Sequence, residues 1–370
     1  MSRLRQRVFS GLAAVLLAQA WAGDAPALAP AATSSSRARA RVVIVEGAGA
    51  TDAFAPNLPR VRQLFDAGLT NLAGTASSAE AWATYVTAAD VVGIKVLSQP
   101  GALSGTRPAV VEALVGSLLA AGHPATNIVI WDKYREDLRA AGYLTLAARL
   151  GVVAEGAVQA GYDPAVFYEN TIPGELVWGD LEYQPGGESM GQKSYVTRLL
   201  TSRITRVVNV SPMLNHNLLG VSGNLFSLSL GSVDNTRRFD EDLDRLAVAV
   251  PEIYALPEVG DRVAFSVVDA LVAQYRGERD SLLHYATPLN QLRFSTDPVA
   301  LDVLSIAELA ARRRGKGSQE VPVNPLPYLN AELLELGVSK ADAIRQDRIQ
   351  LPPMGTVVPS VAPSPAATRR

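Results

Sequence analysis

DVVGIKVLSQPGALSGTRPAVVEALVGSLLAAGHPATNIVIWD, residues 90–132, carries the clearest sign of how this chain folds. Both of its ends are apolar, β-branched runs of strand length. Between them, Pro108 stands in the first turn of a helical pattern, which Gly122 closes. The apolar side chains of that pattern recur at helical spacing, at Val111, Leu114, Val115, Leu118 and Leu119. A strand, a helix and a strand in this order predict two parallel strands with a covering helix.

The same alternation continues on both sides of this unit. Further strand-like runs are RVVIVEG (41–47), ITRVVNVSPM (204–213), DRVAFSVV (261–268) and LRFS (292–295). Further helical patterns are KYREDLRAAGY (133–143), SYVTRLLTSR (194–203), DALVAQY (269–275) and PVALDVLSIAELAARRR (298–314). The chain is therefore predicted to be an α/β protein with one or more mostly parallel sheets flanked by helices.

Composition shifts along the chain divide it into segments. Residues 23–40 are rich in Ala, Pro and Ser and are typical of a linker, whereas residues 341–370 are Pro-rich and predicted to be disordered. Between them we expect one α/β domain over residues 41–340. Residues 151–195, rich in Gly and Pro, read as an insertion that is antiparallel or covers a site. The domain then either stays whole or forms two lobes, 41–150 and 196–340.

The first 22 residues predict a secretory signal peptide. Arg3, Arg5 and Arg7 precede an apolar stretch that ends in the small residue Ala22. This stretch is shorter than the roughly 20 residues that span a bilayer. We expect cleavage after Ala22 and a periplasmic or secreted protein with no stable membrane span. Cleavage after Ala29 and an uncleaved anchor are the alternatives.

Composition excludes several kinds of chemistry. The chain has no cysteine, so it has no disulfides, no iron–sulfur cluster and no cysteine-ligated zinc. Its three histidines leave carboxylates as the main metal ligands, which favours hard or borderline cations. The formal net charge is −2, and loss of three arginines with the signal peptide gives −2 − 3 = −5. A mildly acidic protein lacks the charge of a nucleic-acid binder.

Polar side chains gather at the carboxyl ends of the predicted strands, where open α/β sheets bind their ligands. Each of them could instead be an ordinary helix cap, but together they predict a site at one rim of the sheet. They are Lys95, Ser104, Thr106, Arg107, Asp132, Lys133, His216, Asp269, Thr296 and Asp297.

NHNLLGVSGNLFSLSLG, residues 215–231, is the most polar and glycine-rich of these strand ends. Gly220 and Gly223 would let the backbone turn sharply into a helix or approach a ligand closely. Ser222 and Asn224 would then lie at the N-terminus of that helix, which favours an anion. His216 suits proton transfer or metal ligation. The alternative is a structural turn whose histidine bonds a backbone carbonyl.

From these residues we predict an enzyme that binds a small anionic, carboxylated molecule, by isomerase or hydrolase chemistry. Expected catalytic residues are His216 and Asp297. Asp132 and Asp269, with Asp297, would hold a divalent metal or orient basic groups. The expected ligand-binding residues are Lys95, Thr106, Arg107, Asn217, Ser222 and Asn224. Aromatic walls would come from the insertion, at Tyr168, Trp178 or Tyr183.

Seven motifs follow one another as in domain-of-unknown-function family 362, and the chain resembles this family from about Ala81 to Leu309. The motifs are AWATYVTAADVVGIKVL, SGTRPAVVEALV, NIVIWDKYREDLRAAGY, VVNVSPMLNHNLLGVSGNL, GSVDNTRRF, VVDALVAQYRG and STDPVALD. The resemblance implies a bacterial, often exported protein whose activity is not established. Some members of the family carry an added ferredoxin-type module, which this cysteine-free chain lacks.

A weaker resemblance is to the nickel-dependent lactate racemases, which share TRP before a helix and a His followed by Gly-x-Ser-Gly. His216, Gly220, Ser222 and Gly223 match that frame. The lysine that anchors the nickel-pincer cofactor in those enzymes is replaced by Phe226, so this resemblance implies no such cofactor here. Leu97 likewise replaces the asparagine of family 362. These two changes support the alternative of a non-catalytic periplasmic binding protein.

Overall fold

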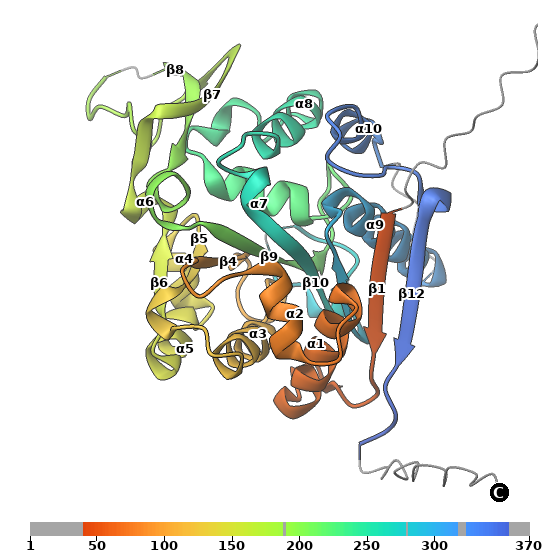
Figure 1. Ribbon diagram of the computed structural model, residues 1–370. Helices are drawn as coiled ribbons and strands as arrows, with labels where there is room; N and C mark the ends of the chain where they lie inside the picture. The colour runs from red at the N-terminus through yellow and green to blue at the C-terminus, as the bar shows by residue number, and fades with distance from the viewer. Residues whose placement is uncertain (1–39, 188–189, 279, 317–322, 355–370) are drawn as a thin grey trace, which may run out of the picture. The chain divides into compact units, whose positions relative to one another are not determined.

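The computed structural model describes residues 40–187, 190–278, 280–316 and 323–354 (Figure 1). Its main element is an eight-stranded sheet in the order β12-β1-β11-β10-β9-β4-β5-β6. Strand β11 runs antiparallel to both of its neighbours, and the other five pairs are parallel. The strands are β1 (Ala40–Glu46), β4 (Val92–Val96), β5 (Ile128–Asp132), β6 (Val153–Gly156), β9 (Arg206–Leu214), β10 (Val263–Gln274), β11 (Ala286–Ser295) and β12 (Ile344–Gln350).

Helices cover both faces of this sheet, which confirms the predicted α/β class. One face packs on α1 (Leu58–Ala73), α2 (Ser78–Tyr85), α3 (Pro108–Ala120), α4 (Arg135–Ala140) and α5 (Tyr143–Leu150). The other packs on α7 (Asn224–Ser232), α8 (Leu243–Tyr254), α9 (Pro298–Gly315) and α10 (Leu326–Leu333). Because side chains alternate along a strand, Val43 and Val45 face the first layer while Val42 and Ile44 face the second. A sheet buried on both faces needs such continuous apolar runs.

The predicted strand–helix–strand unit is present. Strand β4 pairs in parallel with β5, with Val92 opposite Ile128, and α3 connects the two. Pro108 opens α3, because its fixed φ suits the first turn and its missing N–H would be unbonded there. Gly122, at φ +89°, follows the end of the helix.

Within residues 151–195, Val153–Gly156 is β6, the edge strand of the main sheet, and the residues after it form an antiparallel insertion, one of the two expected forms. The short α6 (Ala157–Ala160) leads into β7 (Tyr162–Glu175), which pairs with β8 (Met190–Thr197). The helix predicted at 194–203 is wrong for its first half. Tyr195, Val196 and Thr197 are β-branched or aromatic and extend β8, and only Leu199–Arg203 is helical, as a π-helix.

The helix predicted at 269–275 is also wrong, because β10 continues to Gln274. The helix formers Ala270 and Ala273 pair with β11, and Gln274 pairs with both β11 and β9, so pairing outweighs the intrinsic helix preference of this segment. Strand β10 is therefore longer than expected, and Asp269 lies within it and not at its end.

The prediction of a disordered tail from residue 341 is wrong for residues 344–350. Residues 344–350 form β12, which pairs with β1 along its whole length, and Arg41 bonds Asp347 at 2.7 Å. The sequence did not predict β12, because this strand lies at the edge of the sheet, pairs only with β1 and is largely polar. Strands from 41–150 and from 196–340 share the sheet, so they are not separate lobes.

The predicted signal peptide and residues 23–39 of the linker lie outside the described residues, as do residues 355–370. Residue 40, placed in the linker, is the first residue of β1. Two residues each in β2 (Thr51–Asp52) and β3 (Ala55–Pro56) form a small hairpin after β1. In the part of the chain that the structure describes, no helix is long and apolar enough to cross a membrane.

Candidate functional site

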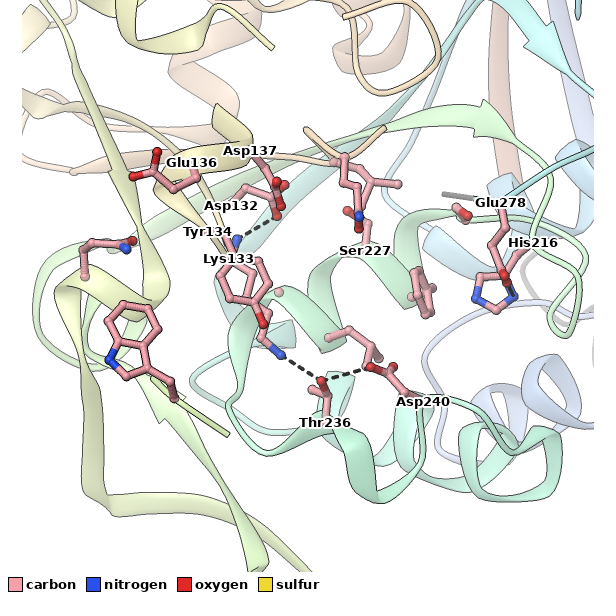
Figure 2. Close-up of a pocket in the computed structure, with 18 residues that line it drawn as sticks. Asp132, Lys133, Tyr134, Glu136, Asp137, His216, Ser227, Thr236, Asp240 and Glu278 are labelled. Carbon is pink, nitrogen blue, oxygen red and sulfur yellow. Dashed lines mark hydrogen bonds and ion pairs between the residues drawn. The ribbon is translucent and has the colours of Figure 1, made fainter. Parts of the chain in front are cut away.

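A cavity of about 490 Å³ lies beyond the carboxyl ends of β4, β5 and β9 (Figure 2). This is the rim at which parallel α/β sheets bind ligands. Residues after β4 and β5, the segment after β9, helix α7 and Trp178 of the insertion form its wall. The polar and aromatic lining side chains include Asp132, Lys133, Tyr134, Glu136, Asp137, Trp178, His216, Ser222, Phe226, Ser227, Thr236, Asp240 and Glu278.

The structure brings four of the polar residues predicted at the rim into this pocket. Asp132 and Lys133 line it from the end of β5, and His216 and Ser222 from the segment between β9 and α7. Lys95 lies directly behind the wall, because its Nζ bonds Asp132 Oδ1 at 2.8 Å and Ser227 Oγ at 3.1 Å. The expectation that ligands bind at the carboxyl ends of the strands, here called the strand-end rule, thus predicted one side of the pocket.

Other predicted residues have structural partners instead. Thr106 is fully buried, and its Oγ1 donates to the Val210 carbonyl at 2.7 Å, tying the start of α3 to β9. Asp297 caps α9 by accepting from the Ala300 and Val338 amides at 2.8 and 2.9 Å. Neither lines the pocket, so Asp297 is placed as a helix cap.

Arg107 and Asp269 form a buried ion pair away from the pocket. Arg107 Nη1 lies 3.1 Å from Asp269 Oδ2, and the two side chains are 3% and 0% exposed. The Arg107 amide donates to the same oxygen at 2.9 Å. Both were expected at the rim, but Asp269 lies inside the long β10, so the pair fastens α3 to the sheet.

His216 and Glu278 are the pair of pocket residues best arranged for proton transfer. Nδ1 of His216 lies 2.9 Å from Glu278 Oε1, and 3.2 Å from the amides of Leu218 and Leu219. One nitrogen cannot both donate to the carboxylate and accept from these amides. The amides of Leu218 and Leu219 donate to an unprotonated Nδ1, whereas a proton on Nδ1 would be donated to the shorter and charged contact, Glu278 Oε1. No described residue hydrogen-bonds Nε2, which is therefore the nitrogen that a ligand can reach.

Phe226 forms the wall beside this histidine. The two rings meet edge to face, with centroids 4.5 Å apart. The aromatic ring fixes the imidazole plane and keeps water from that side. The pocket therefore has an apolar surface beside His216.

The N-terminus of α7 does bind an anion, but the anion belongs to the protein. Asp302 of α9 accepts from the Asn224 amide at 2.7 Å, the Leu225 amide at 3.0 Å and Asn224 Nδ2 at 3.0 Å. Gly223 makes room for it, since a Cβ there would lie 2.2 Å from Asp302 Oδ1. Burial raises the pKa of Asp302 to about 7, against the lowering effect of these donors. The expected ligand role of Asn224 is taken by this internal contact.

Asn217 points away from the main pocket. It is exposed, its amide lies 3.2 Å from Glu278 Oε1, and its side-chain oxygen accepts from Asn215 at 2.9 Å. It lines a second cavity, of about 420 Å³, with Tyr275, Arg276 and Arg313. The expected ligand-binding role of Asn217 therefore has no place in the main pocket.

Five carboxylates and one lysine give the pocket lining an acidic character. The carboxylates are Asp132, Glu136, Asp137, Asp240 and Glu278, and the lysine is Lys133. Burial raises the pKa of Asp137, and the neighbouring carboxylates of Asp132 and Glu136 raise it further. Burial lowers the pKa of Lys133, whose Nζ donates to Thr236 Oγ1 at 2.8 Å.

The insertion supplies one of the three aromatic walls that were expected. Trp178 lines the pocket and is 72% exposed. Tyr168 is buried, and its hydroxyl donates to Glu252 at 2.6 Å. Neither Tyr168 nor Tyr183 lines the pocket.

The donors do not favour a metal at Asp132 and Asp269. Each carboxylate already has a basic partner, Lys95 or Arg107. Over the described ranges, no group of three or more His, Asp or Glu side chains lies close enough to hold a metal ion. These contacts therefore give no support to Asp132 and Asp269 as ligands of one metal ion.

Sequence reasoning missed several pocket residues. Glu278 lies in the loop between β10 and β11, and its contact with His216 joins positions 62 residues apart, so no local pattern announces it. Ser227 had a usable signal. It is the first serine of the FSLSLG alternation on α7, which follows the glycine-rich turn.

Comparison with known proteins places this chain in a family. The profile of DUF362, described as a domain of unknown function, matches residues 92–307. The chain belongs to the DUF362 family. The matched segment contains every residue that lines the main pocket, so the pocket lies within the DUF362 domain.

The DUF362 chain has no match among curated proteins. It is similar to a solved structure, the crystal structure of a protein from Thermotoga maritima, with 11% sequence identity and a TM-score of 0.37. The alignment covers 73% of this chain and 61% of the Thermotoga maritima chain, so it spans less than two thirds of that protein.

Proposed function

We propose that this DUF362 protein is an enzyme of isomerase or hydrolase type that moves protons on a small polar molecule. The observation that supports this most is the contact of 2.9 Å between His216 Nδ1 and Glu278 Oε1 at the pocket wall. A carboxylate that holds Nδ1–H leaves Nε2 as the base and stabilises the imidazolium formed when Nε2 takes a proton.

The pocket lining favours a neutral or cationic ligand over an anionic one. The expected anion depended on Lys95 and Arg107, which are 0% and 3% exposed and paired with Asp132 and Asp269. Five carboxylates against Lys133 alone would repel a carboxylate ligand. We therefore propose an uncharged or positively charged ligand in place of the anionic ligand expected from the sequence.

Each side of the pocket suits a different part of such a ligand. Figure 2 shows His216 and Glu278 at one end and Tyr134 and Glu136 at the other. The far end, with the ring of Tyr134 and the carboxylate of Glu136, suits a hydroxyl-rich or cationic group. The reacting group would then face His216 Nε2.

The test compares variants with a matched histidine control. Wild type, His216→Gln, Glu278→Gln and His284→Gln are incubated in D2O with a defined panel of small uncharged and cationic esters and hydroxy ketones. Hydrolysis and deuterium uptake are followed by proton NMR. We expect turnover by wild type and by His284→Gln, whose histidine is exposed and outside the pocket. Loss of the base should slow turnover about a hundredfold, and loss of its carboxylate partner less.

A non-catalytic binding protein is the second candidate, and the ring of Phe226 against His216 favours it. The same NMR samples report binding through line broadening of the panel compounds. Binding without turnover of any panel compound would contradict the enzyme and support the binding protein. Equal turnover by His216→Gln and wild type would contradict the role of His216.

We further propose that the chain is exported and that residues 1–22 are removed. The support is the run of three arginines followed by an apolar stretch ending in Ala22. The partner is then a small molecule outside the cytoplasm, with no role for nucleic acid, given the net charge of −2.

A further inference from the structure

Ser227 presents a hydroxyl to the pocket from α7, and a buried lysine lies directly behind it. Lys95 Nζ is 3.1 Å from Ser227 Oγ, and Lys95 is 0% exposed. Figure 2 shows Ser227 between Asp132 and His216 on the pocket wall. Ser227 itself is 2% exposed, and that small surface faces the cavity.

The chain is built to admit this lysine. Gly231, one turn after Ser227, has no side chain, and a Cβ there would lie 2.2 Å from Lys95 Cε. Helix α7 can therefore approach β4 closely enough for Lys95 to reach Ser227.

Lys95 has three partners, which fit an uncharged amine as well as an ammonium. Nζ lies 2.6 Å from the Val96 carbonyl, 2.8 Å from Asp132 Oδ1 and 3.1 Å from Ser227 Oγ. An amine has two N–H donors for the two acceptors and a lone pair for the Ser227 hydroxyl. Burial lowers the pKa of Lys95, and Asp132 opposes that effect.

Asp132 remains satisfied when Lys95 is uncharged. Its Oδ2 accepts from the amide and hydroxyl of Ser98 at 2.7 and 2.6 Å, and its Oδ1 accepts from the Lys133 amide at 2.8 Å. These three donors stabilise the carboxylate without help from the ammonium. Lys95 can thus lose and regain a proton without leaving an unbonded buried charge.

We propose that Ser227 is a nucleophile and that Lys95 is its general base, which makes the pocket that of a serine hydrolase acting on an ester or amide. Ser227 Oγ forms a bond to the carbonyl carbon while its proton moves to Lys95 Nζ. The tetrahedral intermediate expels the alcohol or amine, which takes that proton. Water then attacks the acyl carbon and gives a proton to Lys95. Lys95 passes this proton to Ser227 Oγ as the bond from that oxygen to the acyl carbon breaks, and the acid is released.

This assignment rests on the proposed function only in sharing its pocket, and it narrows the reaction to hydrolysis. The acidic lining of the pocket favours a neutral or cationic substrate for this reaction too. His216 is not needed for the first step, because the proton of Ser227 passes to Lys95. The two proposals can therefore fail separately.

A serine-directed probe tests the nucleophile without knowledge of the substrate. Folded wild type is treated with a small alkyl fluorophosphonate, whose phosphorus bonds the serine oxygen as fluoride leaves. Intact mass gives the stoichiometry and peptide mapping gives the position. We expect one adduct, on Ser227, none in Ser227→Ala, and an unchanged adduct in Ser229→Ala. Ser229 is a matched control on the same helix whose hydroxyl bonds the Val250 carbonyl at 2.8 Å.

A double variant tests the base. Lys95→Met with Asp132→Asn removes both charges together, so no unpaired buried charge remains. The rate of Ser227 modification should fall about a hundredfold, as for loss of a general base. His284→Gln, whose histidine is exposed and outside the pocket, should keep the wild-type rate. Absence of an adduct on Ser227 in wild type, or an unchanged rate in the double variant, would overturn the proposal.

Discussion

Two buried ionisable residues of opposite sign contact helix α7. Asp302 accepts from the amides of its first two residues, Asn224 and Leu225. Lys95 reaches Ser227 in its middle, and Gly231 near its end leaves room for Lys95. The negative charge lies where the helix dipole favours it. These two contacts set where α7, and with it Ser227 and Phe226, stands against the sheet.

Asp302 should make the stability of the protein depend on pH. Its pKa is about 7 when folded and its ordinary value is 3.8, so the folded state binds the proton more tightly. The stabilisation from this proton is complete below pH 3.8 and is lost as pH rises through about 7. For one proton the slope reaches about 1.4 kcal/mol per pH unit.

Urea unfolding of wild type and Asp302→Asn between pH 5 and pH 8 measures this effect. Burial also raises the pKa of Asp234, to about 6, but both proteins retain that group. The difference between their free energies of unfolding therefore isolates Asp302. Wild type should lose stability relative to the variant as pH rises. Parallel curves would show that Asp302 does not exchange a proton in this range.

Among the elements, β12 closes an edge that would otherwise leave β1 unpaired. It adds a parallel strand along all seven residues of β1. The segment after it also satisfies Arg60, which is 2% exposed and donates to the carbonyls of Leu351 and Pro352 at 3.2 and 2.7 Å. The edge of the sheet and a buried guanidinium therefore depend on the same short segment.

Truncation after Ala343 should destabilise the protein and promote aggregation. It exposes the hydrogen-bonding groups of β1 and leaves Arg60 without its two carbonyl acceptors. We expect a loss of several kcal/mol, because a buried charged group loses its partners. Thermal melting and light scattering measure both effects. A chain ending at Met354 keeps every described residue and is the control. Equal melting temperatures for the two truncations would contradict a structural role for β12.

At the scale of the whole molecule, the sequence predicts the sheet better than the pocket. Continuous β-branched runs such as Val92–Val96 identify buried strands because a sheet covered on both faces needs them. The strand-end rule then finds Asp132 and His216 from local order alone. It fails for Asp269, because pairing with two neighbours carries β10 five residues beyond it, to Gln274.

The remaining pocket residues depend on contacts between distant segments. Glu278 and Trp178 come from a loop and an insertion whose conformations are set by long-range packing. The helix cap of Asp302 shows the same limit, since it joins α7 to a residue 78 positions away. Local sequence patterns predict the N-terminus of α7, but they do not predict that the carboxylate of Asp302 binds there.

The proposed export concerns the full chain, and it predicts a defined change in the mature protein. Removal of residues 1–22 takes away Arg3, Arg5 and Arg7 and no acidic residue, so the formal net charge moves from −2 to −5. The protein should therefore be recovered from outside the cytoplasm, with Gly23 as its first residue. N-terminal sequencing and intact mass of protein from its own cells measure this. Ala22→Trp should slow processing, because a signal-peptide cleavage site needs a small residue at this position. A start at Pro30 would identify Ala29 as the cleavage site, and intact Met1 in the cytoplasm would contradict export.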